Sequence, residues 1–214
     1  MGWRHVLVGV AIVTGFTAVV LSDAAHAGLL WVLDVTEPVI ADWPVMGGVV
    51  FVALAAVSAM LAFFSSVLLV PVALDAWGVP LTIVLLWVAW TLGGIGAYAL
   101  GRYLGYPVVA RFTSSDLLER YRQRVSAHAS FGVVLLFQLA LSSEVPGYVL
   151  GLARYPLVRY ASALALAEIP YAVLTVYIGA GLVERRLALL FGAAAAVLLV
   201  SGLAFLVFRR WLRA

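Results

Sequence analysis

The chain has 214 residues, of which 65% are hydrophobic and only 11% charged, whereas a soluble domain carries about a quarter charged residues. This composition indicates an integral membrane protein. The absence of cysteine excludes disulfides and thiolate metal sites, and the net charge of +3 comes from arginines that flank apolar segments, which does not indicate a nucleic-acid partner.

The first apolar segment is predicted at residues 6–21. The Ala25-His26-Ala27 sequence that follows resembles a signal-peptide cleavage site, so a cleaved signal and an uncleaved first helix both fit the pattern. Residues 22–44 hold acidic residues and no arginine, which is typical of an external segment under the positive-inside rule. We expect residues 1–44 to form an N-terminal transmembrane helix and an external loop.

The next stretch, residues 45–77, is apolar but interrupted by Ser65-Ser66, Pro71 and Asp75. One spanning helix followed by a loop would produce this pattern. A hairpin that enters and leaves the membrane on the external side, and is broken close to the proline, would produce it as well.

The charges that follow favour the hairpin. Residues 80–101 form an uninterrupted apolar span, and residues 102–128 carry five arginines, which is the signature of the cytoplasmic side. The span therefore begins outside, so the stretch before it must return to the side from which it entered. Residues 115–128 are amphipathic and basic, which fits either a helix on anionic lipid or a solvated linker.

Small residues recur every four positions along the 80–101 span, at Gly93, Ala97, Gly101 and Gly105. Positions four apart share one face of a helix, and small side chains on that face allow another backbone to approach closely. We predict close helix packing at this face.

Residues 131–151 are the most informative stretch. The apolar run lasts about eleven residues before a Ser-Ser-Glu sequence ending at Glu144, whereas about 20 are needed to cross the hydrocarbon core. Pro146-Gly147 is predicted to break the helix, and a second short run continues through Gly151. Broken backbone at membrane depth must be covered by protein or line a watery cavity, so we predict a re-entrant hairpin with the acid near its tip. A loop between two soluble helices is the alternative.

Two further spans complete the chain, at residues 162–178 and 187–208, with a short external turn between them. The last span ends at an arginine-rich terminus, so both termini are expected in the cytoplasm. The absence of lysine, together with abundant alanine, valine and arginine, is typical of a GC-rich bacterial genome, so we expect the bacterial inner membrane.

The fold class predicted is an all-α polytopic membrane protein with two opposed re-entrant helical hairpins in an inverted-repeat arrangement and about four transmembrane helices. Each half consists of a hairpin and a span, at residues 45–101 and 131–181. They form a core at residues 45–182, followed by a C-terminal transmembrane helix within 183–214. In transporters, an inverted repeat places the substrate site near the midplane, where broken helices meet.

Three acids are expected at membrane depth: Asp75, Glu144 and Glu168. A carboxylate there costs several kcal/mol, about 2.5–3.5 for aspartate on insertion scales, and such residues are usually paired, protonated or functional. Proton coupling is therefore chemically available. A protonated acid that bonds free backbone at a hairpin tip is the alternative. Gln138, six residues before Glu144, could line the same cavity.

Arg102, Arg154 and Arg159 fall at cytoplasmic ends of helical segments. A guanidinium group suits a phosphate, so these residues are candidates for binding a lipid headgroup, and a role as positive-inside anchors fits equally well. The sequence contains no nucleophile–base pair, metal-ligand cluster or nucleotide-binding loop. We therefore expect neither an enzyme nor a cofactor.

Two segments resemble the DedA/VTT (SNARE-associated Golgi protein) superfamily. They are GGIGAYALGRYLGY, with its Gly101-Arg102 and Gly105, and FGVVLLFQLALSSEVPGYVLGLARYPLVRYASALALAEIPYAVLTVYIGAG. The second includes the Pro-Gly hairpin with Gly151 and a span that closes at Gly179. The similarity extends over residues 60–182 and implies two re-entrant hairpins that face each other. It also implies translocation of a lipid, either a polyprenyl phosphate or a phospholipid, with proton or sodium coupling.

The chain departs from the superfamily pattern at both hairpins. Members usually have arginines where Gln138 and Glu144 stand here, and a Pro-rich motif ending in glutamate in the first hairpin, of which only Pro71 and nearby Asp75 remain. The acidic and phosphate-binding groups are therefore rearranged relative to the superfamily.

We expect a transporter that flips or scrambles a membrane lipid, with Glu144 and Asp75 as titratable groups and Arg102 and Arg154 binding the headgroup. A proton-coupled carrier of a small solute is the alternative in the same class. From another class, the chain could be a non-transporting scaffold that binds a partner through the small-residue face of residues 93–105. A homo-oligomer is compatible with each of these.

Overall fold

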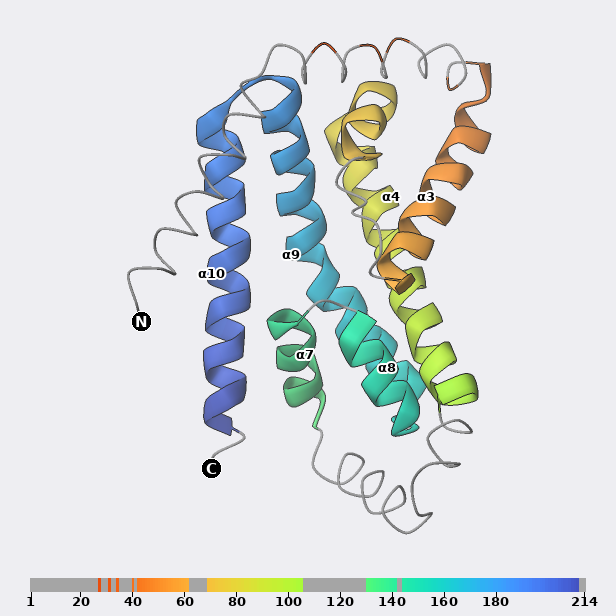
Figure 1. Cartoon of the computed structure of the whole chain (residues 1–214), viewed down its shortest axis with the longest axis vertical. Coiled ribbons are helices and arrows are strands. Elements are labelled where there is room, and N and C mark those ends of the chain that lie inside the picture. Colours follow the sequence, from red (N-terminus) through yellow and green to blue (C-terminus); the bar gives the residue numbers. More distant parts are fainter. Residues whose placement is uncertain are drawn as a thin grey trace.

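The computed structural model describes residues 42–61, 69–105, 130–141 and 144–211, together with four single residues before them: Ala27, Trp31, Asp34 and Ile40. All regular secondary structure in this part of the chain is helical (Figure 1). The predictions for the first apolar segment, the amphipathic stretch and the two Ser-Ser pairs lie outside the described residues.

Three of the described helices are long and apolar enough to cross a membrane. They are α4 (Val70–Leu100) with its π-helical continuation η2 (Gly101–Gly105), α9 (Leu157–Val183) and α10 (Leu187–Trp211). The 27 residues of α9 rise about 40 Å, more than the ~30 Å hydrocarbon core. The predicted spans 80–101, 162–178 and 187–208 lie in these helices, so the chain is an all-helical membrane protein.

A fold at Gly78 divides α4 into two parts. Gly78 has φ 69° and ψ 174°, a backbone conformation that favours glycine. Nine residues of straight helix span about 13.5 Å, yet the Thr82 hydroxyl lies 2.9 Å from the Ala73 carbonyl oxygen and 2.8 Å from that of Gly78. The first turns of α4 therefore fold back against the long part. Pro71 lies buried in the first turn, where a proline costs no hydrogen bond.

Helix α3 (Pro44–Leu61) is too short for the full hydrocarbon core. Its 18 residues rise about 27 Å. In Figure 1 it starts at the upper edge, runs beside α4 and ends near mid-height.

Two short helices follow from the other end of the molecule, α7 (Phe131–Ala140) and α8 (Glu144–Leu152). They rise about 15 and 14 Å, so neither crosses the hydrocarbon core. In Figure 1, α7 rises from the lower end to mid-height and α8 returns downward. α7 packs against α9 and α10, whereas α8 packs against α4 and η2.

The predicted break at Pro146-Gly147 is wrong. The helix ends at Ala140, and Leu141 has an extended backbone with φ −132° and ψ 157°. Pro146 is the third residue of α8, within the first turn, where the N–H that proline lacks would have no helical partner. The proline and glycine therefore lie in the first turn of the second helix.

The glycines of α8 allow it to lie directly against α4. A Cβ on Gly147 would meet the Cβ of Ala97 at 2.9 Å, and one on Gly151 would clash with the carbonyl oxygen of Tyr98. The predicted hairpin glycines are therefore contact points between helices.

The small-residue face of α4 is occupied within the chain. A Cβ on Gly93 would clash with the Ala56 carbonyl of α3, and one on Gly101 would lie 2.5 Å from the Tyr148 carbonyl of α8. Gly105 has no comparably close neighbour among the described residues. Close packing is thus confirmed at Gly93 and Gly101, which contact α3 and α8.

Candidate functional site

The ends of the short helices meet near mid-height, and two tyrosines bind these ends. Tyr148 of α8 donates a hydrogen bond of 2.8 Å to the carbonyl of Met60, the next-to-last residue of α3. Tyr171 of α9 donates to the carbonyl of Leu139, the next-to-last residue of α7, and its hydroxyl lies 2.8 Å from Ser201 Oγ of α10. The last four carbonyls of a helix lack helical partners, and leaving them unpaired at membrane depth is costly. Each tyrosine therefore stabilises a broken helix end inside the protein.

Gln138, on the last turns of α7, is 3% exposed. Neither atom of its amide has a hydrogen-bond partner among the described residues. The Tyr160 hydroxyl is a neighbour of this amide, but it donates to the Gly94 carbonyl at 2.8 Å. A buried amide that makes no hydrogen bond costs about 1–3 kcal/mol, so this side chain can still donate to and accept from a polar group of a substrate.

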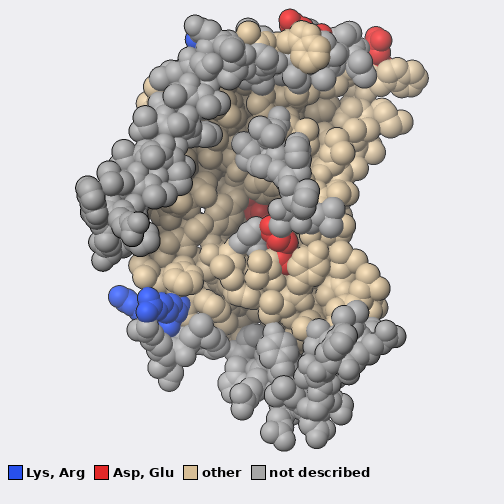
Figure 2. Space-filling view, viewed as in Figure 1, with Lys and Arg blue, Asp and Glu red and all other residues tan. Residues whose placement is uncertain are grey.

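Two of the predicted acids lie on helices that take part in this junction. Glu144 opens α8 directly after the break, and Glu168 lies near the middle of α9 and is 6% exposed. The Glu168 carboxyl interacts electrostatically with the hydroxyls of Tyr160 and Tyr171. Figure 2 shows acidic side chains inside a hollow near the middle of this face of the molecule.

We call Gln138, Glu144 and Glu168, with the hydroxyls of Tyr160 and Tyr171, the mid-height recess. Asp75, the third predicted acid, lies three residues before the fold at Gly78 and is exposed. Tyr160 and Tyr171 were not predicted as site residues, because a tyrosine in an apolar run is usually an interfacial anchor. Their hydrogen bonds join different helices and are seen only in the folded structure.

A second polar site lies at the lower end of α4. Arg102 and Arg154, which the sequence predicted as headgroup ligands, share one pocket of about 410 Å³. The other lining residues are Ile95, Tyr98, Ala99, Tyr103, Pro156 and Leu157. Arg159 does not line it. We call this the arginine pocket.

Hydrogen bonds fix one guanidinium group of the arginine pocket. Arg102 donates to the Tyr98 hydroxyl at 2.7 Å, and that hydroxyl donates to the Tyr155 carbonyl at 2.5 Å. The Tyr98 ring also stacks on the Tyr160 ring, with 4.9 Å between centroids. The orientation of Arg102 is thus tied to the turn that carries Arg154.

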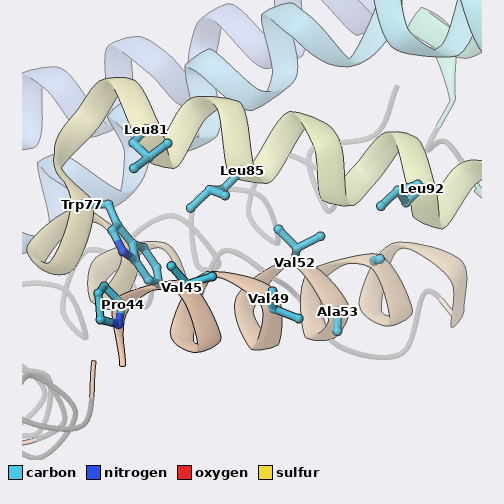
Figure 3. Close-up of a pocket in the computed structure, with 11 residues that line it drawn as sticks. Pro44, Val45, Val49, Val52, Ala53, Trp77, Leu81, Leu85 and Leu92 are labelled. Carbon is cyan, nitrogen blue, oxygen red and sulfur yellow. The ribbon is translucent and has the colours of Figure 1, made fainter. Parts of the chain in front are cut away.

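An apolar groove of about 660 Å³ lies between α3 and α4 (Figure 3), and α3 occupies the upper half of Figure 1. Its lining is entirely hydrocarbon apart from the indole of Trp77: Pro44, Val45, Gly48, Val49, Val52, Ala53, Ala56, Trp77, Leu81, Leu85 and Leu92. Val45 is 80% exposed and Val49 59%, so the groove opens outward. Chemically, it suits an acyl or prenyl chain and no polar group.

No group of three or more metal-ligating side chains occurs among the described residues. In comparisons with known proteins, the family model of the VTT domain matches residues 7–181. This match begins well before residue 60, where the similarity seen in the sequence starts. A search of curated proteins and a search of solved structures each found no match.

Proposed function

Because the chain belongs to the VTT-domain (DedA/VTT) family, we propose that it is a membrane transporter that translocates a lipid between leaflets through the mid-height recess. The observation that carries the proposal is the meeting of broken helices. α3 and α7 each end inside the protein, and each has its next-to-last carbonyl bonded by a tyrosine from another helix. Helices broken near the midplane are where transporters bind substrates and coupling ions.

The arrangement supports two opposed re-entrant hairpins. The first consists of α3, the connection and the folded-back start of α4, and it enters from the upper end in Figure 1. The second consists of α7 and α8 and enters from the lower end. Neither α7 nor α8 is long enough to cross the hydrocarbon core. In a membrane that α9 and α10 span, the junction between α7 and α8 would therefore lie inside the hydrocarbon core.

Lipid translocation needs a polar route for the headgroup and an apolar route for the chains. The mid-height recess offers an amide and two carboxyl groups to a headgroup that has left the water. The groove between α3 and α4 offers the chains a hydrocarbon-lined volume of about 660 Å³. Carboxyl groups near the midplane can also bind and release protons, so we propose a cation, either a proton or sodium, as the coupling ion.

The charges at the two ends support an orientation with the lower end in the cytoplasm of a bacterial inner membrane. Arg209 and Arg210 close α10 at the lower end, where the arginine pocket also lies. Asp42 precedes α3 at the upper end, and Figure 2 shows acidic side chains along that edge. Arg185 and Arg186, in the turn between α9 and α10, are the exceptions to this distribution. Under the positive-inside rule, the arginines at the lower end favour a cytoplasmic C-terminus.

The test is transport of headgroup-labelled phospholipid in proteoliposomes, read by chemical quenching of the outer-leaflet label. We expect the wild-type chain to expose inner-leaflet label faster than protein-free vesicles do, and Glu144→Gln to return to the protein-free rate. The control is Glu184→Gln, because Glu184 lies in the α9–α10 turn, where it forms a 2.9 Å ion pair with Arg186. This variant should transport like wild type.

Two results would contradict the proposal in different ways. Lipid movement at the protein-free rate with wild-type protein would refute translocation, and uptake of a small solute by the same vesicles would then favour a carrier. Full transport by Glu144→Gln would refute the role of the mid-height recess and leave translocation standing.

A further inference from the structure

A hydrogen bond joins the end of α3 to α8, between residues 88 positions apart in the sequence. The Tyr148 hydroxyl donates to the Met60 carbonyl at 2.8 Å, and Met60 is the next-to-last residue of α3. A carbonyl in the last turn of a helix has no partner within the helix, so it can accept this bond. Because the acceptor belongs to the backbone, the bond depends on one side chain, that of Tyr148. It connects the two proposed hairpins.

The tyrosine shares a face of α8 with an acid of the mid-height recess. Tyr148 follows Glu144 by one helical turn, and residues four apart lie on the same face of a helix. Both residues are half-buried. The end of α3 that Tyr148 binds is therefore held beside the face of α8 that carries Glu144.

Helix α8 is fixed on α4, whereas α3 lies at the edge of the molecule. A Cβ on Gly147 would meet the Cβ of Ala97 at 2.9 Å. One on Gly101 would lie 2.5 Å from the Tyr148 carbonyl, so α4 and α8 are in backbone contact. α3 packs against α4 and contacts α8, and its other face is exposed, with Leu54 at 53%. Of the two helices that the hydrogen bond joins, α3 is therefore the one with room to move.

The end of α3 also separates the apolar groove from α8. Ala56, one turn before Met60, is the last residue of α3 that lines the groove, and Leu92 is the last of α4 (Figure 3). At about 100° per residue, Leu92, Gly93 and Ala97 point in successive directions around α4. Leu92 faces the groove, Gly93 faces the Ala56 carbonyl of α3, and Ala97 faces α8. α3 therefore stands between the groove and the helix that carries the acid of the recess.

We propose that the Tyr148–Met60 hydrogen bond is a latch, and that a lipid enters the mid-height recess between α3 and α8 when the latch opens. With the bond broken, the end of α3 moves away from α8. A headgroup then reaches Glu144 while its chains stay in the apolar groove. Tyr148 is thus a positioning residue, which acts by holding α3 in place. The inference rests on the proposed function, since it takes the transported molecule to be a lipid.

The first measurement compares the wild-type chain, Tyr148→Phe and Tyr171→Phe in the proteoliposome assay. Phenylalanine keeps the ring and removes the donor, which destabilises the closed latch. We expect Tyr148→Phe to move lipid about two- to tenfold faster than wild type, the factor that corresponds to the net loss of one neutral hydrogen bond.

Tyr171→Phe is the matched control. It also removes a hydroxyl from the next-to-last carbonyl of a broken helix, but it leaves the bond between α3 and α8 intact. This variant should not move lipid faster than wild type. If both tyrosines only stabilised the fold, neither variant would be faster.

The second measurement follows the distance between the two helices. The chain contains no cysteine, so spin labels can be attached at Val57→Cys on α3 and Val145→Cys on α8, where the native side chains are 48% and 45% exposed. The distance between the labels, measured by pulsed electron paramagnetic resonance on the full chain in liposomes, should shift to longer values in Tyr148→Phe. It should stay at the wild-type values in Tyr171→Phe. Because this measurement needs no lipid movement, it tests the latch separately from the proposed function.

Two results would overturn the latch. Transport by Tyr148→Phe at or below the wild-type rate would show that the hydroxyl only stabilises the end of α3. Unchanged distances between the labels would show that the bond does not hold α3 against α8. A wild-type chain that moves no lipid would instead refute the proposed function, and longer distances in Tyr148→Phe would then still support the latch as a contact between α3 and α8.

Discussion

Replacing the buried amide of Gln138 by a hydrocarbon side chain should stabilise the protein. Gln138 is 3% exposed, and both amide atoms lack hydrogen-bond partners among the described residues. Leucine has a similar volume and no polar group, so Gln138→Leu removes the penalty of burying an unpaired amide, about 1–3 kcal/mol. We expect a higher free energy of unfolding by that amount, together with slower lipid transport, because the recess loses its donor and acceptor.

The assay is denaturant unfolding of the purified chain in detergent, with Thr82→Val as the comparison. Thr82 is also fully buried, but its hydroxyl lies 2.9 and 2.8 Å from two carbonyl oxygens. Its replacement should lower the free energy of unfolding by about 1–2 kcal/mol, since those carbonyls lose a donor. Opposite signs for the two variants are the expected result. Destabilisation by Gln138→Leu would show that the amide is paired in the folded protein and would refute the reasoning.

Three further perturbations test the packing around the recess. Tyr171→Phe leaves the Leu139 carbonyl without a donor, so it should lower the free energy of unfolding by about 1–3 kcal/mol in the same assay. An unchanged free energy of unfolding would show that the Tyr171 hydroxyl does not stabilise the end of α7. Gly151→Ala pushes a methyl group into the α4 backbone and should cost about 1–3 kcal/mol, whereas Gly132→Ala, with open space around it, should be tolerated. Glu184→Gln breaks an exposed ion pair and should change the unfolding free energy by less than about 1 kcal/mol, at low and at high salt.

The spanning helices could be predicted from the sequence because apolar length and flanking charge determine them. Residues 187–208 lie within α10, and residues 80–101 within the long part of α4 and the start of η2. The break in the 131–151 stretch was predicted at the wrong place. Pro146 is unfavourable inside a helix and favourable in its first turn, and the sequence around it does not distinguish the two.

The sites could be predicted only in part, because they depend on contacts distant in sequence. Arg102 and Arg154 were predicted from their positions at helix ends, but their shared pocket depends on the packing of α8 against α4. Tyr171 contacts α7 and α10 through residues about thirty positions away, which no local pattern reveals. Asp75 was predicted as an acid at membrane depth because it interrupts an apolar stretch, but its side chain is exposed, three residues before the fold at Gly78.

Helix α8 connects the two candidate sites, so a change in its packing should affect both. Glu144 begins α8 at the mid-height recess, and Arg154 follows its end at the arginine pocket. Nine residues of helix separate the two levels by about 14 Å, roughly half of the hydrocarbon core. A headgroup that passed from one site to the other would therefore move along this helix. Since Gly151 fixes α8 against the backbone of α4, Gly151→Ala should reduce both stability and lipid transport, whereas Glu184→Gln should leave lipid transport unchanged.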